Sequence, residues 1–184
     1  MRTDLIFLIP EITLLLMACL VLIVDAFSKD PLHKMTYLMA QLSLVLTLSA
    51  VIYYSPDYSY IAFDGGFITD TMSILLKSFI CAITIVVFFY SYEYLKENEL
   101  LKGEYFVLGL FAVLGMMVMT SAYHLLSIYL GLELLSLSLY AMVAMQRRST
   151  FATEAAIKYF VSGALASGML LYGISMIYGL TGAL

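Results

Sequence analysis

The sequence predicts an all-α membrane protein, a polytopic helical bundle of about six transmembrane helices with its N-terminus outside. Of the 184 residues, 63% are hydrophobic and only 12% are charged, whereas a soluble globular domain is roughly 45–50% apolar and 25% charged. The apolar residues come in stretches close to the ~20 residues that an α-helix needs to cross a bilayer. No basic stretch is longer than Arg147-Arg148, which argues against nucleic acid as a partner.

Turn-forming residues divide the apolar sequence into its predicted spans. Pro31 follows the first span, Pro56 follows the second, and Gly103 precedes the fourth. Little more than Tyr123 and His124 separates the fourth span from the fifth, so these two helices are expected to form an antiparallel hairpin. The predicted spans are Leu5–Ala26, Met35–Tyr54, Thr71–Tyr94, Glu104–Ala122, Leu125–Met145 and Thr153–Leu180.

The basic residues in the connections predict the orientation. Lys and Arg are enriched in cytoplasmic loops, and here they gather in alternate connections. The N-terminal end and the remaining connections hold only Arg2. Both termini are therefore expected outside, and the first, third and fifth connections in the cytoplasm. The basic residues of these three connections are Lys29, Lys34, Lys96, Lys102, Arg147 and Arg148.

Glu133 lies near the middle of the apolar run Leu125–Met145. A carboxylate at the centre of a spanning helix costs at least ~2.5–3.5 kcal/mol, and such groups commonly serve as proton or ion relays. Tyr129 lies four residues before Glu133, Ser136 three residues after it, and Tyr140 four residues after Ser136. At these spacings the three hydroxyl side chains share the helix face of Glu133. Glu133 is therefore the first candidate for proton translocation, with these hydroxyls around it. The alternative is a carboxylate that only holds helices together.

The sixth span carries the second candidate, Lys158. Glu154 precedes it by four residues, a spacing that favours a local ion pair at the membrane surface. Ser162 follows it, and Gly163 and Ser167 are small residues spaced for close helix packing in lipid. If this helix is central in a bundle, Lys158 faces protein or water and can act as a relay instead.

The remaining polar residues of the spans carry less weight. Lys77 lies in the third span and can either snorkel to the surface or join a relay, and His124 can titrate near neutral pH or be an exposed loop residue. Glu11 is interpreted as a structural hydrogen-bonding group. Cys19 and Cys81 stand apart inside apolar helices, which favours small buried hydrophobes over a disulfide or a metal site.

Two of these helices resemble a known family. Residues 124–145, HLLSIYLGLELLSLSLYAMVAM, and residues 153–173, TEAAIKYFVSGALASGMLLYG, are similar to the antiporter-like subunits of respiratory complex I. The opening LIPEITLLLMACLVLIVDAF resembles the first helix of the same subunits. The resemblance implies that Glu133 matches an essential mid-membrane glutamate and Lys158 a charged lysine. Family members are much longer and contain two inverted helical repeats. By this resemblance, residues 1–103 are three N-terminal helices, and residues 104–184 are the first three helices of a truncated antiporter-like repeat.

The resemblance also implies a function and partners. A multi-pass subunit of the bacterial inner membrane would carry protons, beside other antiporter-like and small membrane subunits. FMN, iron–sulfur clusters, NADH and quinone would belong to partner subunits, because this chain has neither a Gly-rich dinucleotide loop nor a cysteine cluster. Two alternatives stay open. One is a cation/proton antiporter subunit without a dehydrogenase; the other is a membrane scaffold in which Glu133 only joins helices.

Overall fold

The fold is a bundle of long helices that run side by side. The computed structural model describes residues 2–28, 30, 32–56, 59–146 and 149–182, and within them six helices are long and apolar enough to cross a membrane. This agrees with the predicted polytopic all-α class. The spans are α2 (Ile9–Phe27), α3 (Lys34–Tyr53), α4 (Thr71–Glu97), α5 (Gly103–Thr120), α6 (Leu125–Val143) and α7 (Thr150–Thr181).

The first predicted span, Leu5–Ala26, is two helices and not one. A short α1 (Arg2–Phe7) ends before Leu8, and α2 begins at Ile9. Pro10 explains the break, because it has no N–H to donate and its ring would clash with the carbonyl four residues earlier in a continuous helix. Near the start of α2 the same proline is tolerated, since the first N–H groups of a helix have no partner within the helix.

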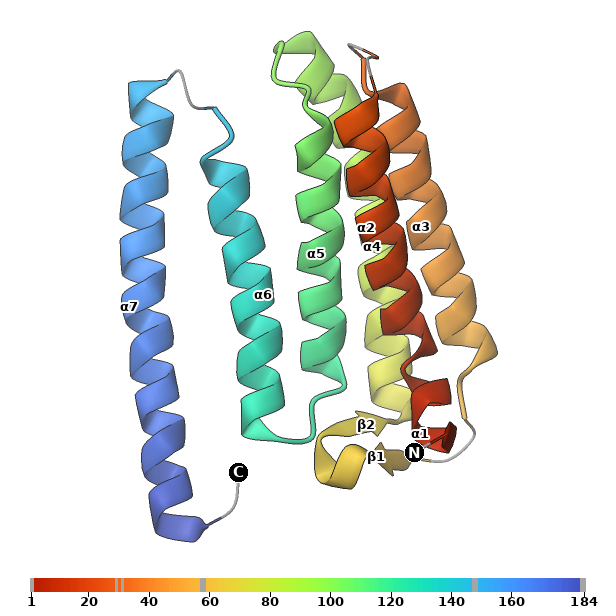
Figure 1. The fold of residues 1–184 in the computed structure, drawn as a ribbon, viewed down its shortest axis with the longest axis vertical. Coiled ribbons are helices and arrows are strands. Elements are labelled where there is room, and N and C mark those ends of the chain that lie inside the picture. Colours follow the sequence, from red (N-terminus) through yellow and green to blue (C-terminus); the bar gives the residue numbers. More distant parts are fainter. Residues whose placement is uncertain (1, 29, 31, 57–58, 147–148, 183–184) are drawn as a thin grey trace.

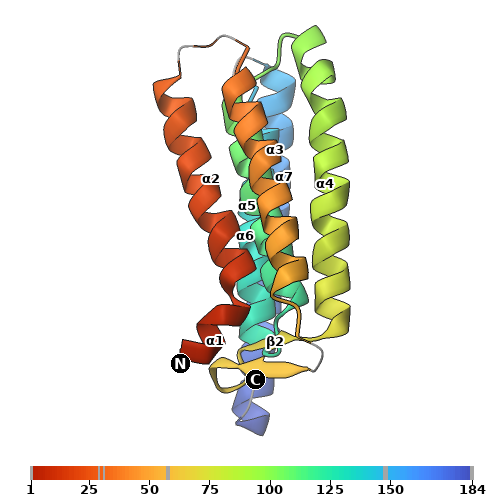
Figure 2. The same cartoon turned by 90° about the vertical axis from the view of Figure 1, so that its right-hand side faces the viewer.

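A small β-hairpin, which the sequence pattern did not predict, connects α3 to α4. Strands β1 (Tyr60–Ala62) and β2 (Phe67–Thr69) pair antiparallel, and a 3₁₀ turn, η1 (Phe63–Gly65), joins them. The Ile68 N–H donates to the carbonyl of Ser121 at 2.8 Å, and Phe67 forms a β-bridge with Ala122. The hairpin is thereby bound to the linker between α5 and α6. Figure 2 shows it lying across the end of the bundle where the chain begins.

Side-chain caps define the starts of the third and sixth spans. The Asp70 side chain accepts a hydrogen bond from the Ser73 N–H at 2.8 Å, and the Asp70 N–H donates to the Ser73 hydroxyl at 3.0 Å. Such a reciprocal cap satisfies two donors at a helix start. The Ser149 hydroxyl accepts from the Ala152 N–H in the same way. This cap lets α7 begin at Thr150, three residues before the predicted start.

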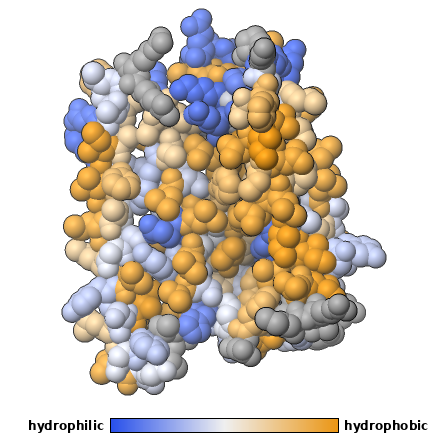
Figure 3. Space-filling model, viewed as in Figure 1, coloured by the Kyte–Doolittle hydropathy of each residue, from blue (hydrophilic) through white to orange (hydrophobic). Residues whose placement is uncertain are grey.

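The hydrophobic core lies among α2, α3, α4 and α5. Helix α6 packs along the far side of α5, and α7 is the outermost helix, beside α6 (Figure 1). Apolar side chains also cover much of the middle of the outer surface, and hydrophilic ones gather at its upper end (Figure 3). This distribution is expected of a chain whose surface meets lipid. The buried core includes Leu14, Leu44, Phe88, Phe106 and Leu110.

Helices α5 and α6 approach each other through two glycines. A Cβ placed on Gly115 would lie 2.7 Å from the Gly131 carbonyl oxygen, and one placed on Gly131 would lie 2.8 Å from the Gly115 carbonyl oxygen. Backbone therefore meets backbone at this crossing. Small residues at helix interfaces permit such close packing where lipid provides no hydrophobic driving force.

The described lysines of the connections lie at one end of the bundle. Lys34 begins α3, Lys96 is in the last turn of α4, and Lys102 precedes α5. These helix ends lie opposite the β-hairpin (Figure 1). Lys29, Arg147 and Arg148 fall outside the described residues. The alternation of ends agrees with the predicted path of the chain, and which end faces the cytoplasm stays a prediction.

Cysteine labelling tests this orientation. In a chain whose Cys19 and Cys81 are replaced by alanine, Asn98→Cys should resist a membrane-impermeant thiol reagent in intact cells, whereas Ser59→Cys should react. Both positions are exposed and lie in loops at opposite ends. Both should react after the membrane is permeabilised, and the reverse pattern in intact cells would overturn the orientation.

Candidate functional site

Glu133 lies halfway along α6, on the side that meets α7. Its side chain is half-buried, and the hydroxyl of Ser167 on α7 donates a hydrogen bond to Oε2 at 2.5 Å. Ser167 is one of only three buried residues of α7. The sequence pattern marked Ser167 only as a small packing residue. What it could not show is that α7 brings Ser167 level with Glu133.

Tyr129 extends this contact into a short chain of hydroxyls. Its phenolic oxygen lies 3.2 Å from the Ser167 hydroxyl. A serine hydroxyl has one proton to donate, so when Ser167 donates to Glu133 it accepts from Tyr129. The chain Tyr129–Ser167–Glu133 therefore holds the carboxylate between two helices and gives one of its oxygens a charge-assisted partner.

The other predicted residues of the Glu133 face have different neighbours. Tyr140 packs edge-on against Tyr159 and Phe160 of α7, with ring centroids 4.9 and 5.5 Å apart. A Cβ on Gly163 would overlap the Tyr140 hydroxyl, so a larger residue there would displace the Tyr140 ring. Ser136 is half-buried on α6.

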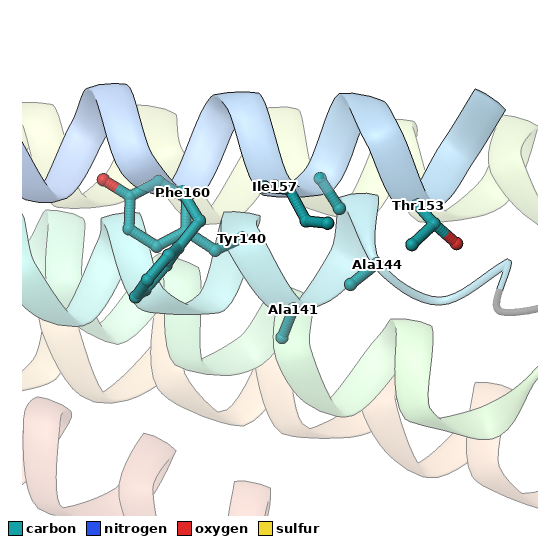
Figure 4. A pocket seen from close by; sticks show the side chains of 7 residues that line it. Tyr140, Ala141, Ala144, Thr153, Ile157 and Phe160 are labelled. Atoms are coloured by element: carbon teal, nitrogen blue, oxygen red, sulfur yellow. The ribbon is translucent and has the colours of Figure 1, made fainter. Parts of the chain in front are cut away.

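A cavity of about 560 Å³ lies between α6 and α7, on the side of Glu133 toward the lysine-bearing end. Figure 4 shows Tyr140 and Phe160 at one end of this cavity and Thr153 at the other. The volume exceeds that of several water molecules, each of which occupies roughly 30 Å³ of the liquid. The lining residues are Tyr140, Ala141, Ala144, Thr153, Ala156, Ile157 and Phe160.

Lys158 does not contact Glu133 in this arrangement. Its Nζ lies 2.5 Å from Glu154 Oε1, and the two side chains are 74% and 61% exposed. Lys158 is nine residues before Ser167, or roughly 13 Å along α7, toward the lysine-bearing end. Ser162 is exposed on the same helix. The structure thus contains the local ion pair, and a relay role for Lys158 stays a prediction.

Lys77 lies in the interior and does not reach toward a membrane surface. Its Nζ is 2.5 Å from Glu11 Oε1, with side-chain exposures of 3% and 5%. From the sequence alone, Lys77 and Glu11 were interpreted separately. The fold brings them together, Glu11 from α2 and Lys77 from α4. His124 is half-buried at the start of α6, in the linker that the β-hairpin binds.

Among the described residues, no three His, Cys, Asp or Glu side chains are gathered as metal ligands would be. The candidate residues form three groups: Glu133 with its two hydroxyl partners, an exposed Lys158–Glu154 pair, and a buried Glu11–Lys77 pair.

Comparisons with known proteins give a consistent result. Residues 122–184 match the family described as NADH:quinone oxidoreductase/Mrp antiporter, transmembrane. NADH-quinone oxidoreductase subunit N of Alkalilimnicola ehrlichii is 51% identical over 96% of this chain, and that of Thioalkalivibrio sulfidiphilus is 52% identical over 96%. The chain spans only 36% and 37% of the lengths of these two relatives.

Solved structures extend the similarity to three dimensions. A chain of respiratory complex I from Thermus thermophilus with bound aureothin superposes with a TM-score of 0.76 at 28% identity, over 96% of this chain and 38% of that one. A chain of the membrane-bound sulfane sulfur reductase, an archaeal respiratory membrane complex, has a TM-score of 0.80 at 20% identity over 98% of this chain and 38% of that one. The second match speaks for the fold alone. In fold and sequence, this multi-pass membrane chain is similar to the N-terminal part of NADH-quinone oxidoreductase subunit N.

Proposed function

We propose that this chain belongs to the membrane arm of a proton-pumping NADH-quinone oxidoreductase, and that Glu133 is its mid-membrane proton carrier. The observation that carries the proposal is the position of Glu133: midway along a spanning helix, half-buried, and hydrogen-bonded to Ser167 of the next helix. An ionisable group at that depth is expensive and commonly marks an ion path. The names of the relatives supply the complex in which such a path would work.

The geometry supports a simple mechanism for the carrier. The ionised carboxylate accepts the Ser167 hydrogen bond, and the protonated acid can donate to a neighbouring oxygen or to water. The cavity between α6 and α7 runs from the lysine-bearing end as far as Tyr140, two helical turns from Glu133. Its lining is mostly apolar, and the Tyr140 and Thr153 hydroxyls would be the partners of any water in it. Lys158 follows Ile157, which lines this cavity, and would change the local potential if it left Glu154. Each proton taken up at one end is then released at the other.

The redox reaction is assigned to partner subunits. NADH, FMN, iron–sulfur clusters and quinone would bind there, and the energy released would alter the charges around Glu133. The membrane in question would be the bacterial inner membrane, since the compared relatives are bacterial.

A cation/proton antiporter is the second candidate, because the matching family includes Mrp antiporters. Purification of the native complex distinguishes the two. Flavin- and iron–sulfur-containing subunits should co-purify with this chain and give an absorbance that NADH bleaches. A complex that transports cations against protons and contains neither cofactor would support the antiporter instead.

Lys158 and Glu154 can be separated by substitution. If Lys158 serves the proton path, Lys158→Ala should lower NADH-driven proton translocation severalfold, while Glu154→Ala has a smaller effect. An exposed i, i+4 pair contributes only ~0.2–0.5 kcal/mol, so a purely local role predicts small effects for both. Lys158→Arg should rescue only partly, since a guanidinium does not release its proton. Equal and small losses of proton translocation in the two alanine variants would show that Lys158 only pairs with Glu154 at the membrane surface.

A further inference from the structure

The buried Glu11–Lys77 pair is set apart from the other ion pairs of the described residues by its burial. Glu11 comes from the first turn of α2 and Lys77 from α4, and their side chains are only 5% and 3% exposed. The Lys96–Glu93 pair, in contrast, has exposures of 45% and 65%. Glu11 and Lys77 therefore lie inside the four-helix core, on helices that are far from each other in sequence.

A buried ion pair of this kind adds little to the stability of the folded protein. Removing two charges from water costs several kcal/mol per ion, and well-packed apolar residues in their place are often as stable or more so. Inside a membrane the cost is the same or larger, and ionisable residues there are commonly functional. A role beyond helix packing is the better explanation.

The surroundings of the pair are polar but incompletely bonded. Glu11 Oε2 is buried and, among the described residues, has no hydrogen-bond partner. The hydroxyls of Thr69 and Ser121 are also buried without one. Thr69 lies on the buried face of β2 beside Phe67, and the Ser121 carbonyl binds the same strand. The end of the bundle under the hairpin thus contains acceptor and hydroxyl groups that water or a proton can satisfy.

The pair lies near one end of the bundle. Lys77 is roughly 9 Å along α4 from its first residue, whereas the helix continues to Glu97 on the other side. Its ammonium lies 4.9 Å from the centre of the Phe67 ring, so β2 stands between the pair and the outer end of the helices. Figure 1 shows the hairpin at that end.

We propose that Glu11 and Lys77 form a second proton-exchange site, which opens beneath the β-hairpin and is separate from Glu133. Glu11 takes a proton from water at the hairpin end, becomes a carboxylic acid, and returns the proton to water. The Lys77 ammonium offsets the charge of the ionised carboxylate. On α4, the buried Cys81 lies one turn beyond Lys77, and Asp70 caps the start of the helix. The site does not depend on a role for Glu133 in translocation.

Infrared spectroscopy of the full chain in lipid vesicles tests this site. On acidification a carboxylic-acid band should appear reversibly, and D₂O should shift it. Glu11→Gln should lose this band, whereas Glu133→Gln should keep it. Glu93→Gln is the matched control, because it removes an exposed carboxylate paired with a lysine, and it should also keep the band. Lys77→Met should retain the band in alkaline buffer, because an ionised Glu11 would then be buried without a partner.

Two further results keep the test decisive. If Glu11→Gln does not fold, Glu11→Asp should shift the band and not abolish it. If the pair only joins α2 to α4 and exchanges no proton, no Glu11 band should appear on acidification while the helical amide signal stays intact. That outcome, or a band that is lost in Glu93→Gln, would overturn the proposal without affecting the role proposed for Glu133.

Discussion

Glu133→Ala should reduce NADH-driven proton translocation by about a hundredfold, since a positioned proton-transfer group typically contributes 10²–10⁴-fold. The variant removes the only carboxylate of α6 and leaves Ser167 without its acceptor. Glu133→Asp should retain part of the activity, because a carboxylate remains but is displaced by one methylene. The measurement is acidification of membrane vesicles by the intact complex, compared with its rate of quinone reduction.

Two controls give the Glu133 result its meaning. Ser167→Ala keeps the carboxylate but removes its hydrogen-bond donor, together with the contact to Tyr129. A hydrogen bond with one charged partner is worth about 1.5–3 kcal/mol, so this variant should cause a smaller loss than Glu133→Ala. Glu93→Ala removes an exposed carboxylate and should leave translocation unchanged. If the complex that contains Glu133→Ala assembles and translocates protons normally, Glu133 only joins helices. Failure to assemble would favour the scaffold hypothesis.

Gly131→Leu should prevent the normal packing of α6 against α5. Even the Cβ of an alanine at this position would lie 2.8 Å from the Gly115 carbonyl oxygen and from the Met119 nitrogen, and these backbone atoms cannot rotate away. Gly131→Ala should therefore lower the free energy of unfolding by about 1–3 kcal/mol, the usual cost of overpacking. The leucine variant should lose more, and little folded protein is expected.

Unfolding of the purified chain in detergent, followed by circular dichroism, measures this effect. Gly168→Ala on α7 is the matched control, because a Cβ there meets nothing within 4 Å. It should unfold at the same point as the parent or later, since alanine stabilises a helix interior by roughly 0.5–1 kcal/mol relative to glycine. If Gly131→Ala unfolds together with the parent, the close backbone contact between α5 and α6 is wrong.

Much of the fold could be predicted because lipid makes a strong demand on sequence. Every spanning segment must be long, apolar and helical, and the predicted spans lie within a few residues of α2 to α7. The β-hairpin was missed because its strands have three residues each, too few for a repeating pattern. The hairpin is also held by the α5–α6 linker, about fifty residues further along the chain, and a local sequence pattern does not reveal such a contact.

The candidate site was only partly predictable for the same reason. Glu133 is conspicuous in an apolar helix, so sequence alone singled it out. Ser167 and the Glu11–Lys77 pair depend on which helices meet. Sixty-six positions separate Glu11 from Lys77, and no local spacing connects them. The available signal was that both are ionisable, opposite in charge, and near the same end of the predicted bundle.

Helix α6 meets its two neighbours through contacts of different kinds. Toward α5 it rests on the Gly115–Gly131 backbone contact, whereas α7 buries only Ala156, Ser167 and Ile174. Because Ser167 belongs to α7 and Glu133 to α6, the hydrogen bond between them depends on how the two helices are aligned. The partner of the carboxylate is thereby set by the register of α7 against α6.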